Sequence, residues 1–142
     1  MKKRIVKESF SRKESDLFSL EQTKDLTGRY KEVEDRLLSL EYPLRLGAIK
    51  TTDMSAMRYK RGDYLLCHDD MLEGRKFAYI LYLKSPDIGG ELSLISDKTP
   101  YKKKKILPKE NRLVVFKVSK HSWHEVEEIE RGERLSIGGW FY

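Results

Sequence analysis

Short runs of β-branched and aromatic residues, separated by turn signals, fill the chain after Gly47 and limit its fold most strongly. The turn signals include Glu73-Gly74, Pro86 to Gly90 and Arg131-Gly132. The predicted strands are Ser55–Tyr59, Tyr64–Asp70, Lys76–Lys84, Glu91–Ile95, Arg112–Val118, His124–Ile129 and Arg134–Tyr142. Many short strands with such turns are typical of a sandwich or barrel, and we expect a jelly roll.

The first 50 residues have a different texture and are predicted to be mostly helical or irregular. Ser11 and Glu14 have capping-box spacing. From Arg29, apolar residues recur at roughly helical spacing until Pro43 stops or kinks the helix. We expect one domain over 1–142, mainly β with N-terminal helices (α+β): a helical buttress over about 1–50 and a double-stranded β-helix (jelly-roll) core over about 51–142.

The stretch GDYLLCHDD, which ends at Asp70, closes an apolar run with a histidine and two acids. In a strand, His68 and Asp70 lie on one face, roughly 7 Å apart. Two histidines and a carboxylate, with coordination positions left open, hold the metal of non-haem Fe(II) oxygenases. The third ligand would be His121 or His124, since the chain has no other histidine. An HxD triplet alone is a weak signal, because it occurs often by chance.

Arg134 opens the predicted strand RLSIGGWFY, ten residues after His124. An oxygenase that uses 2-oxoglutarate needs a cation at the bottom of its pocket to hold the distal carboxylate. A guanidinium suits this role, because its planar fork can donate two hydrogen bonds to a carboxylate.

The net charge of +6 and the pI near 9.3 favour acidic partners such as nucleic acid or ribosomes, and also small anionic substrates. Four consecutive lysines, Lys102 to Lys105, are predicted to form a loop. This loop either contacts phosphate or is a solvated segment that keeps neighbouring strands from pairing with other chains.

One cysteine excludes an intramolecular disulfide and fits a reducing compartment. The N-terminal MKKR is a weak nuclear-address signal, so we expect a cytoplasmic or nuclear location, or both. The longest apolar run, Phe77 to Leu83, is far too short to span a membrane, and no membrane association is expected.

Several linked stretches resemble the prolyl-hydroxylase group of 2-oxoglutarate oxygenases and, within it, above all the eukaryotic ribosomal prolyl hydroxylases. They are SDLFSLEQTKDL, DMSAMRYKRGDYLLCHDD, EGRKFAYILYL, GGELSLI, NRLVVFKVS, HEVEEI and RLSIGGWFY. Taken together, such motifs are far more specific than any one of them. Family members of this type usually carry a second, non-catalytic jelly-roll domain after the catalytic one, and the similarity here covers the catalytic domain.

Position by position, the resemblance implies that His68, Asp70 and His124 ligate Fe(II). It also implies that Arg134 pairs with the distal carboxylate of 2-oxoglutarate. His121 follows Ser119-Lys120 in a predicted turn and is expected to face solvent.

Four further residues have implied roles, each beside a structural alternative. Tyr82 and Tyr59 match tyrosines that contact the cosubstrate, but either also fits the edge of a packed core. Arg75 and Trp140 fall near positions that line the substrate entrance. Arg75 equally fits a hairpin charge, and Trp140 a core aromatic.

The resemblance thus implies an Fe(II)- and 2-oxoglutarate-dependent dioxygenase that hydroxylates a prolyl residue of a protein, in particular a small-subunit ribosomal protein. O2 would be the oxidant and ascorbate the reductant, and ribosomal RNA a further contact. Two alternatives remain: an oxidative demethylase or hydroxylase of nucleic acid, and a non-catalytic ribosome- or RNA-binding module on the same scaffold.

Overall fold

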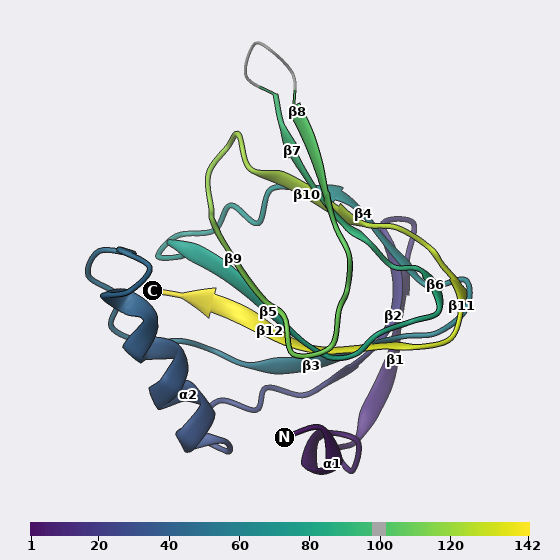
Figure 1. The fold of residues 1–142 in the computed structure, drawn as a ribbon, viewed down its shortest axis with the longest axis horizontal. Coiled ribbons are helices and arrows are strands. Elements are labelled where there is room, and N and C mark those ends of the chain that lie inside the picture. Colours follow the sequence, from purple (N-terminus) through teal and green to yellow (C-terminus); the bar gives the residue numbers. More distant parts are fainter. Residues whose placement is uncertain (98–101) are drawn as a thin grey trace.

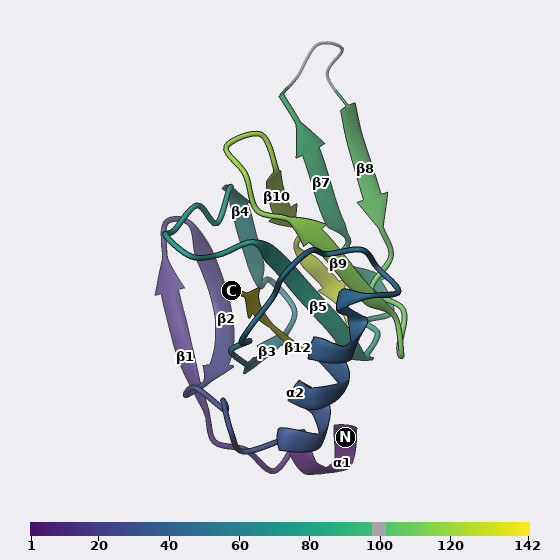
Figure 2. The same cartoon turned by 90° about the vertical axis from the view of Figure 1, so that its left-hand side faces the viewer.

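The computed structural model describes residues 1–97 and 102–142 and shows a curled antiparallel sheet with helices outside it (Figure 1, Figure 2). The strands are β1 Phe10–Ser15, β2 Phe18–Thr23, β3 Ser55–Tyr59, β4 Tyr64–His68, β5 Phe77–Lys84, β6 Ile88–Gly89, β7 Leu92–Ser96, β8 Lys102–Ile106, β9 Leu113–Lys117, β10 Trp123–Val126, β11 Ile129–Arg131 and β12 Arg134–Phe141. The helices are α1 Lys2–Ile5 and α2 Lys31–Leu38, followed by the 3-10 turn η1 Ser39–Glu41.

Among the described residues, the main sheet has the order β8-β7-β10-β4-β2-β3-β12-β5-β9, and β1 pairs with β2. The sheet curls so that β4, β10, β7 and β8 face β3, β12, β5 and β9 across the interior (Figure 1). A small separate sheet joins β6 to β11. The predicted mainly β fold with a jelly-roll core is confirmed.

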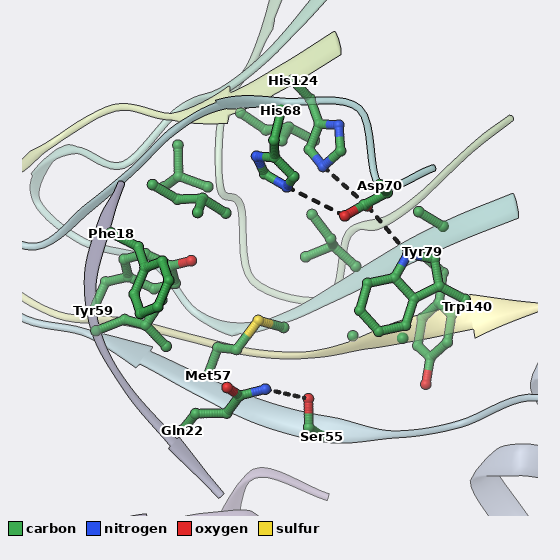
Figure 3. A pocket seen from close by; sticks show the side chains of 18 of the residues that line it. Phe18, Gln22, Ser55, Met57, Tyr59, His68, Asp70, Tyr79, His124 and Trp140 are labelled. Atoms are coloured by element: carbon green, nitrogen blue, oxygen red, sulfur yellow. Dashed lines mark hydrogen bonds and ion pairs between the residues drawn. The ribbon is translucent and has the colours of Figure 1, made fainter. Parts of the chain in front are cut away.

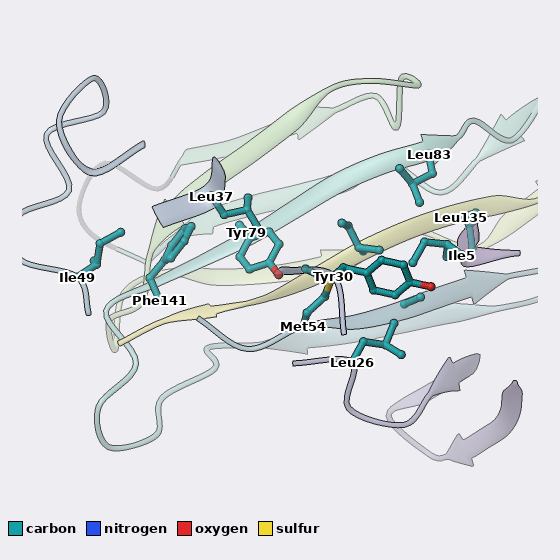
Figure 4. Packing of buried hydrophobic residues seen from close by; sticks show 12 residues of the cluster. Ile5, Leu26, Tyr30, Leu37, Ile49, Met54, Tyr79, Leu83, Leu135 and Phe141 are labelled. Carbon is teal, nitrogen blue, oxygen red and sulfur yellow. The ribbon is translucent and has the colours of Figure 1, made fainter. Parts of the chain in front are cut away.

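Two apolar clusters hold this architecture together. The interior cluster, between the two sides of the curled sheet, contains Leu20, Tyr59, Tyr82, Leu92, Val114, Val126 and Ile129. The second cluster joins α1, α2 and their flanking segments to the outer face of the sheet, where Tyr30 and Leu37 pack with strand residues such as Tyr79 (Figure 4). None of the helices in the described part of the chain is long and apolar enough to cross a membrane.

The N-terminal region matches the sequence prediction only in part. A helix follows Arg29, as predicted, but residues 10–23 form the β1–β2 hairpin, so the helical prediction is wrong there. The hairpin forms because β2 fills the gap between β3 and β4, with Phe18 opposite Leu65. This long-range pairing outweighs the local capping-box signal, as tertiary context often does.

Asp63, in the turn before β4, ties this hairpin to the barrel. Its buried carboxylate accepts hydrogen bonds from Arg12 on β1 (Nη1 to Oδ2, 2.8 Å) and from Ser19 on β2 (3.0 Å). The backbone N–H of Lys60 donates a further bond of 2.8 Å. One carboxylate therefore joins three chain segments.

The Lys102–Lys105 run is also not the predicted loop, because it lies within β8. It pairs with β7 in a regular antiparallel register. Two of its lysines form ion pairs with acidic residues across the sheet, Lys103 with Glu125 (2.7 Å) and Lys105 with Glu127 (2.6 Å). Backbone pairing and these ion pairs accommodate a lysine-rich strand at the sheet edge.

Candidate metal centre and anion pocket

His68 and His124 stand side by side at the top of the interior, because their backbones are directly paired between β4 and β10. Their ring centroids are 4.1 Å apart. Asp70 closes the cluster: its Oδ1 lies 3.3 Å from His68 Nε2 and its Oδ2 lies 3.2 Å from His124 Nε2 (Figure 3). The ligand atoms of all three residues lie within 4.8 Å of one another.

Backbone carbonyls orient both imidazoles toward Asp70. His68 Nδ1 lies 2.8 Å from the carbonyl oxygen of Leu66, and His124 Nδ1 lies 3.4 Å from that of Ser122. The Nδ1–H of each ring donates to the carbonyl and directs Nε2 toward Asp70, where a bound metal would take the place of the Nε2 proton. This is the arrangement that metal-binding histidines usually adopt.

Asp70 reaches the cluster by a different route from the predicted strand alternation. Strand β4 ends at His68, and Asp70 lies beyond it with a left-handed backbone (φ 60°). Aspartate tolerates this conformation better than most residues do. The expectation that Tyr64–Asp70 is one continuous strand is therefore wrong, although the two side chains do converge.

The charges in the cluster favour an ionised carboxylate. Burial would raise the pKa of Asp70, but hydrogen bonds from His124 and His68 outweigh burial and hold that pKa far below its usual range. Burial would lower the pKa of His68, but its hydrogen bonds to Asp70 and to the Leu66 carbonyl, together with the nearby carboxylate charges, raise that pKa. Two imidazole nitrogens and one ionised carboxylate form a donor set suited to a divalent transition metal.

Trp140 and Arg75, predicted to contact substrate, lie directly against Asp70. The indole N–H of Trp140 donates to Asp70 Oδ2 over 3.1 Å (Figure 3). The Arg75 guanidinium carbon lies 3.4 Å from the centre of the Trp140 ring, and Arg75 Nη1 donates to the Asp70 carbonyl over 3.2 Å. Trp140 thus holds the carboxylate, and Arg75 covers Trp140.

Asp53, which sequence reasoning missed, fixes Trp140 in turn. Its Oδ1 accepts the backbone N–H of Trp140 (2.6 Å), and its Oδ2 accepts the Tyr142 hydroxyl (2.9 Å). A side chain at Gly139 would place its Cβ 2.3 Å from the Asp53 carbonyl oxygen, so the close approach requires glycine. The Gly138-Gly139 pair was the sequence signal for this approach.

Arg134 marks the opposite end of the interior. It opens β12, it is only 1% exposed, and its backbone pairs with that of Tyr59 on β3. Its guanidinium carbon lies 4.8 Å from the Tyr59 ring centre and 5.0 Å from that of Tyr82. Within the described part of the chain, Arg134 Nε and Nη1 have no hydrogen-bond partner.

Two hydroxyl groups near Arg134 are also buried without a hydrogen-bond partner in the described part of the chain. They are the Tyr82 hydroxyl and Ser136 Oγ. Sequence reasoning missed Ser136, although strand alternation after Arg134 would have placed both residues on one face. Burial raises the pKa of Tyr82, and it raises that of Tyr59 to about 12, so both remain neutral at physiological pH.

One cavity of about 230 Å³ extends between these two ends. Its polar lining includes His68, Asp70, His124 and Arg134, and the rest of its wall is largely apolar, with Phe18, Leu20, Met57, Ile80, Leu92 and Phe116. Most small-molecule sites have this character, with an apolar wall and a few polar groups that fix orientation.

His121 does not belong to the cluster. Its Nδ1 lies 2.8 Å from Asp97 Oδ1, and both side chains are well exposed. Of the two candidate histidines, it is His124 that lies with His68 and Asp70.

Comparison with known proteins gives a family match over residues 54–142, to the 2OG-Fe(II) oxygenase superfamily. The chain is 38% identical over 158 residues to a Mus musculus protein named prolyl 3-hydroxylase OGFOD1, with 99% of this chain and 29% of that protein aligned. It is 36% identical over 166 residues to the Ostreococcus tauri prolyl 3,4-dihydroxylase OGFOD1, covering 92% and 32%. The chain thus spans about three tenths of the length of these curated relatives.

Solved structures share the fold. A Pseudomonas putida prolyl-4-hydroxylase superposes with a TM-score of 0.76 at 24% identity, covering 98% of this chain and 80% of its own. A Trichoplax adhaerens prolyl hydroxylase, solved with a peptide fragment of the hypoxia-inducible-factor oxygen degradation domain, gives a TM-score of 0.63 at 28% identity, covering 76% and 52%.

Proposed function

Since the chain belongs to the 2OG-Fe(II) oxygenase superfamily, we propose that it hydroxylates a prolyl residue of a protein. Members of this family use Fe(II), 2-oxoglutarate and O2. When bound, iron and cosubstrate supply the oxidation: 2-oxoglutarate and O2 become succinate and CO2, and one oxygen atom enters a C–H bond of the substrate. The relatives named as prolyl hydroxylases support the choice of proline.

The residues present suit the metal. His68, Asp70 and His124 would hold Fe(II) through two imidazole nitrogens and one carboxylate, the donor set of non-haem iron oxygenases. Trp140 would keep the Asp70 carboxylate in position through its 3.1 Å hydrogen bond. Outer hydrogen bonds of this kind support metal affinity in other proteins.

The opposite end of the cavity suits the cosubstrate. Arg134 would pair with its distal carboxylate, because a buried guanidinium with unpartnered nitrogens is matched by an anion that accepts two hydrogen bonds. Tyr82 and Ser136 would donate further hydrogen bonds, and the Tyr59 ring would hold the guanidinium from one side. The apolar wall would exclude water, which strengthens each of these interactions.

For the protein substrate, we propose a prolyl residue of a small-subunit ribosomal protein. The support is the resemblance of the sequence to ribosomal prolyl hydroxylases and the net charge of +6, which suits contact with ribosomal RNA. Arg75 and Trp140 would contact the peptide at the rim of the cavity. Ascorbate would act as reductant, and the enzyme would work in the cytoplasm, the nucleus or both.

The single observation that carries the proposal is one cavity with a His-Asp-His cluster at one end and, at the other, a buried arginine with two nitrogens that have no partner among the described residues. The test combines anaerobic titration of Fe(II) and 2-oxoglutarate with mass spectrometry of ribosomal proteins from cells with and without the gene. We expect both ligands to bind and one proline to lose a single oxygen in the deletion strain. Succinate formation with a nucleic acid substrate, and none with protein, would instead support the nucleic acid alternative.

A further inference from the structure

The β7–β8 hairpin extends beyond the closed part of the barrel and carries the Lys102–Lys105 run (Figure 1, Figure 2). Ile106 on β8 packs into the interior cluster. Lys104 and Lys102 are two and four residues earlier, so they lie on the same face of the strand. On this face, the side chain is apolar at Ile106, inside the core, and is lysine at positions 104 and 102, outside the core.

This lysine face borders a groove of about 1060 Å³ between the hairpin and the β9–β10 connection. Its lysine lining is Lys102, Lys103, Lys104, Lys117 and Lys120, with Leu94 and Phe116 as apolar lining, and the Lys103 amine pairs with Glu125. This concentration of lysines beside an apolar floor favours an anionic occupant with some apolar surface.

The inner end of the groove meets the candidate metal centre. Leu94 on β7 is paired with Lys104 on one side and with His124 on the other. At about 4.8 Å between neighbouring strands, the Lys104 backbone is about 10 Å from that of His124. Phe116 lines both the groove and the interior cavity, with its ring 4.8 Å from that of His124. About three extended residues would therefore connect the lysines to the metal centre.

The opposite face of β8 shows which partner such lysines accept. Lys103 and Lys105 pair with Glu125 and Glu127, so two lysines at alternate positions match two glutamates at alternate positions. An extended strand with acidic residues two positions apart has the spacing that this pattern requires.

The groove face has the same lysine spacing without such glutamates. Among residues 1–97 and 102–142, no acidic side chain forms an ion pair with Lys102 or Lys104, unlike Lys103 and Lys105. The acidic residue closest in sequence on the hairpin, Asp97, pairs with His121 instead.

We propose that this groove binds an extended peptide segment with acidic residues at two alternate positions, on the same polypeptide as the residue that reaches the metal centre. This inference rests on the proposed hydroxylation of a protein. The lysines would select acidic segments over neutral ones. Among ribosomal proteins, we therefore expect the target proline to lie about three residues from a segment with two acidic residues at alternate positions.

The test measures binding by metal-free protein, so that it does not depend on turnover. One labelled synthetic peptide carries a proline followed, three residues on, by Glu-Ser-Glu, and a second carries Gln-Ser-Gln there. Single-stranded oligouridylate is the probe for the competing nucleic acid class. In fluorescence anisotropy at low ionic strength, we expect the Glu peptide to bind about tenfold more tightly than the Gln peptide.

Two double variants of equal charge test whether Lys102 and Lys104 cause the preference for the Glu peptide. K102Q/K104Q should abolish the preference for the Glu peptide, whereas K105Q/K109Q, which changes two lysines outside the groove, should retain it. Equal losses in both variants, equal binding of both peptides, or tighter binding of oligouridylate would overturn the assignment.

Hydroxylation assays with the two peptides distinguish failure of the peptide groove from failure of the proposed function. If the Glu peptide binds through Lys102 and Lys104 but no protein proline is ever hydroxylated, the proposed function fails and the peptide groove stands. If both peptides are hydroxylated equally well at subsaturating concentration, the groove assignment fails and the proposed function stands.

Discussion

At the His68–Asp70 end of the cavity, the polar groups have partners within the protein, whereas at the Arg134 end several polar atoms have none among the described residues. Asp70 accepts from two imidazoles and from Trp140. Arg134, only 1% exposed, has two nitrogens without a partner in the described part of the chain, and the hydroxyl of Tyr82 is likewise unpartnered.

This difference indicates how the two ends respond to ligands. A buried polar group without a partner costs about 1–3 kcal/mol, and a charged group costs more. The Arg134 end therefore gains stability when an anion binds, whereas the metal end is already held together by its own hydrogen bonds. We expect substitutions at the two ends to separate metal affinity from cosubstrate affinity.

The largest effect is expected at the metal end. His124→Ala removes one of the three donors and should weaken binding of Fe(II) or Mn(II) by more than 100-fold, since loss of an outer hydrogen-bond partner alone costs 10–100-fold. His121→Ala is the matched control and should bind metal normally. Calorimetric titration checks both variants, and the reverse result would overturn the choice of His124.

Arg134→Met tests the other end. It should weaken 2-oxoglutarate binding by about 2–5 kcal/mol while metal affinity survives. The ligand-free protein should be as stable as wild type or more so, because an apolar side chain replaces an incompletely paired buried charge. Arg58→Met, one residue from Tyr59, is the control: it loses an ion pair with Glu21 but should keep 2-oxoglutarate affinity. Chemical unfolding and calorimetry report the two quantities separately.

Trp140→Phe addresses the support of the metal end. Phenylalanine keeps an aromatic ring under Arg75 but lacks the N–H that donates to Asp70. Metal affinity should fall about 10- to 100-fold without a matching fall in the melting temperature of the metal-free protein. Trp123→Phe, which loses a bond to the Lys120 carbonyl, is the control. Unchanged metal affinity in Trp140→Phe would show that the indole N–H has no positioning role.

A substitution at Asp63 tests the structure at a position remote from both ends of the cavity. Burial would raise its pKa, but hydrogen bonds from Arg12, the Lys60 backbone and Ser19 outweigh burial, so its pKa lies below the usual value. Its stabilising contribution is therefore complete above the unfolded-state pKa of about 3.9 and is lost as pH falls through the lower folded-state pKa.

Asp63→Asn should accordingly lower the free energy of unfolding by about 1–3 kcal/mol at neutral pH, and by progressively less as the solution is acidified. Asp16→Asn, at an exposed position, should change little. Urea unfolding across this pH range measures the effect. A constant difference between wild type and Asp63→Asn down to strongly acidic pH would contradict the role given to this carboxylate.

The barrel strands were predictable because local signals and long-range packing agree in them. Arg134–Phe141, for example, combines a regular strand pattern with pairing to both β3 and β5. The β1–β2 hairpin was not predictable, since β1 is almost entirely exposed and β2 is a strand only through its pairing with β3 and β4. The loop prediction for Lys102–Lys105 failed for a similar reason, because two of these lysines depend on Glu125 of β10 and on Glu127 just after it.

At the site, the sequence predicted which residues come together but not how they contact one another. The HxD spacing led to His68 and Asp70, yet the left-handed turn at Asp70 has no clear sequence signature. The stack of Arg75 on Trp140 and the hydrogen bond from Trp140 to Asp70 join residues 65 to 70 positions apart. Such contacts follow from the three-dimensional path of the chain and not from any local pattern.

The most direct test compares 2-oxoglutarate with 2-oxobutyrate, which keeps the 2-oxo acid group but lacks the distal carboxylate. Calorimetry on manganese-loaded wild type and Arg134→Met gives four dissociation constants. If Arg134 is the partner of that carboxylate, wild type should prefer 2-oxoglutarate by roughly 30-fold or more, and Arg134→Met should bind both acids almost equally. A variant that still prefers 2-oxoglutarate as strongly as wild type does would contradict the assignment of the two ends.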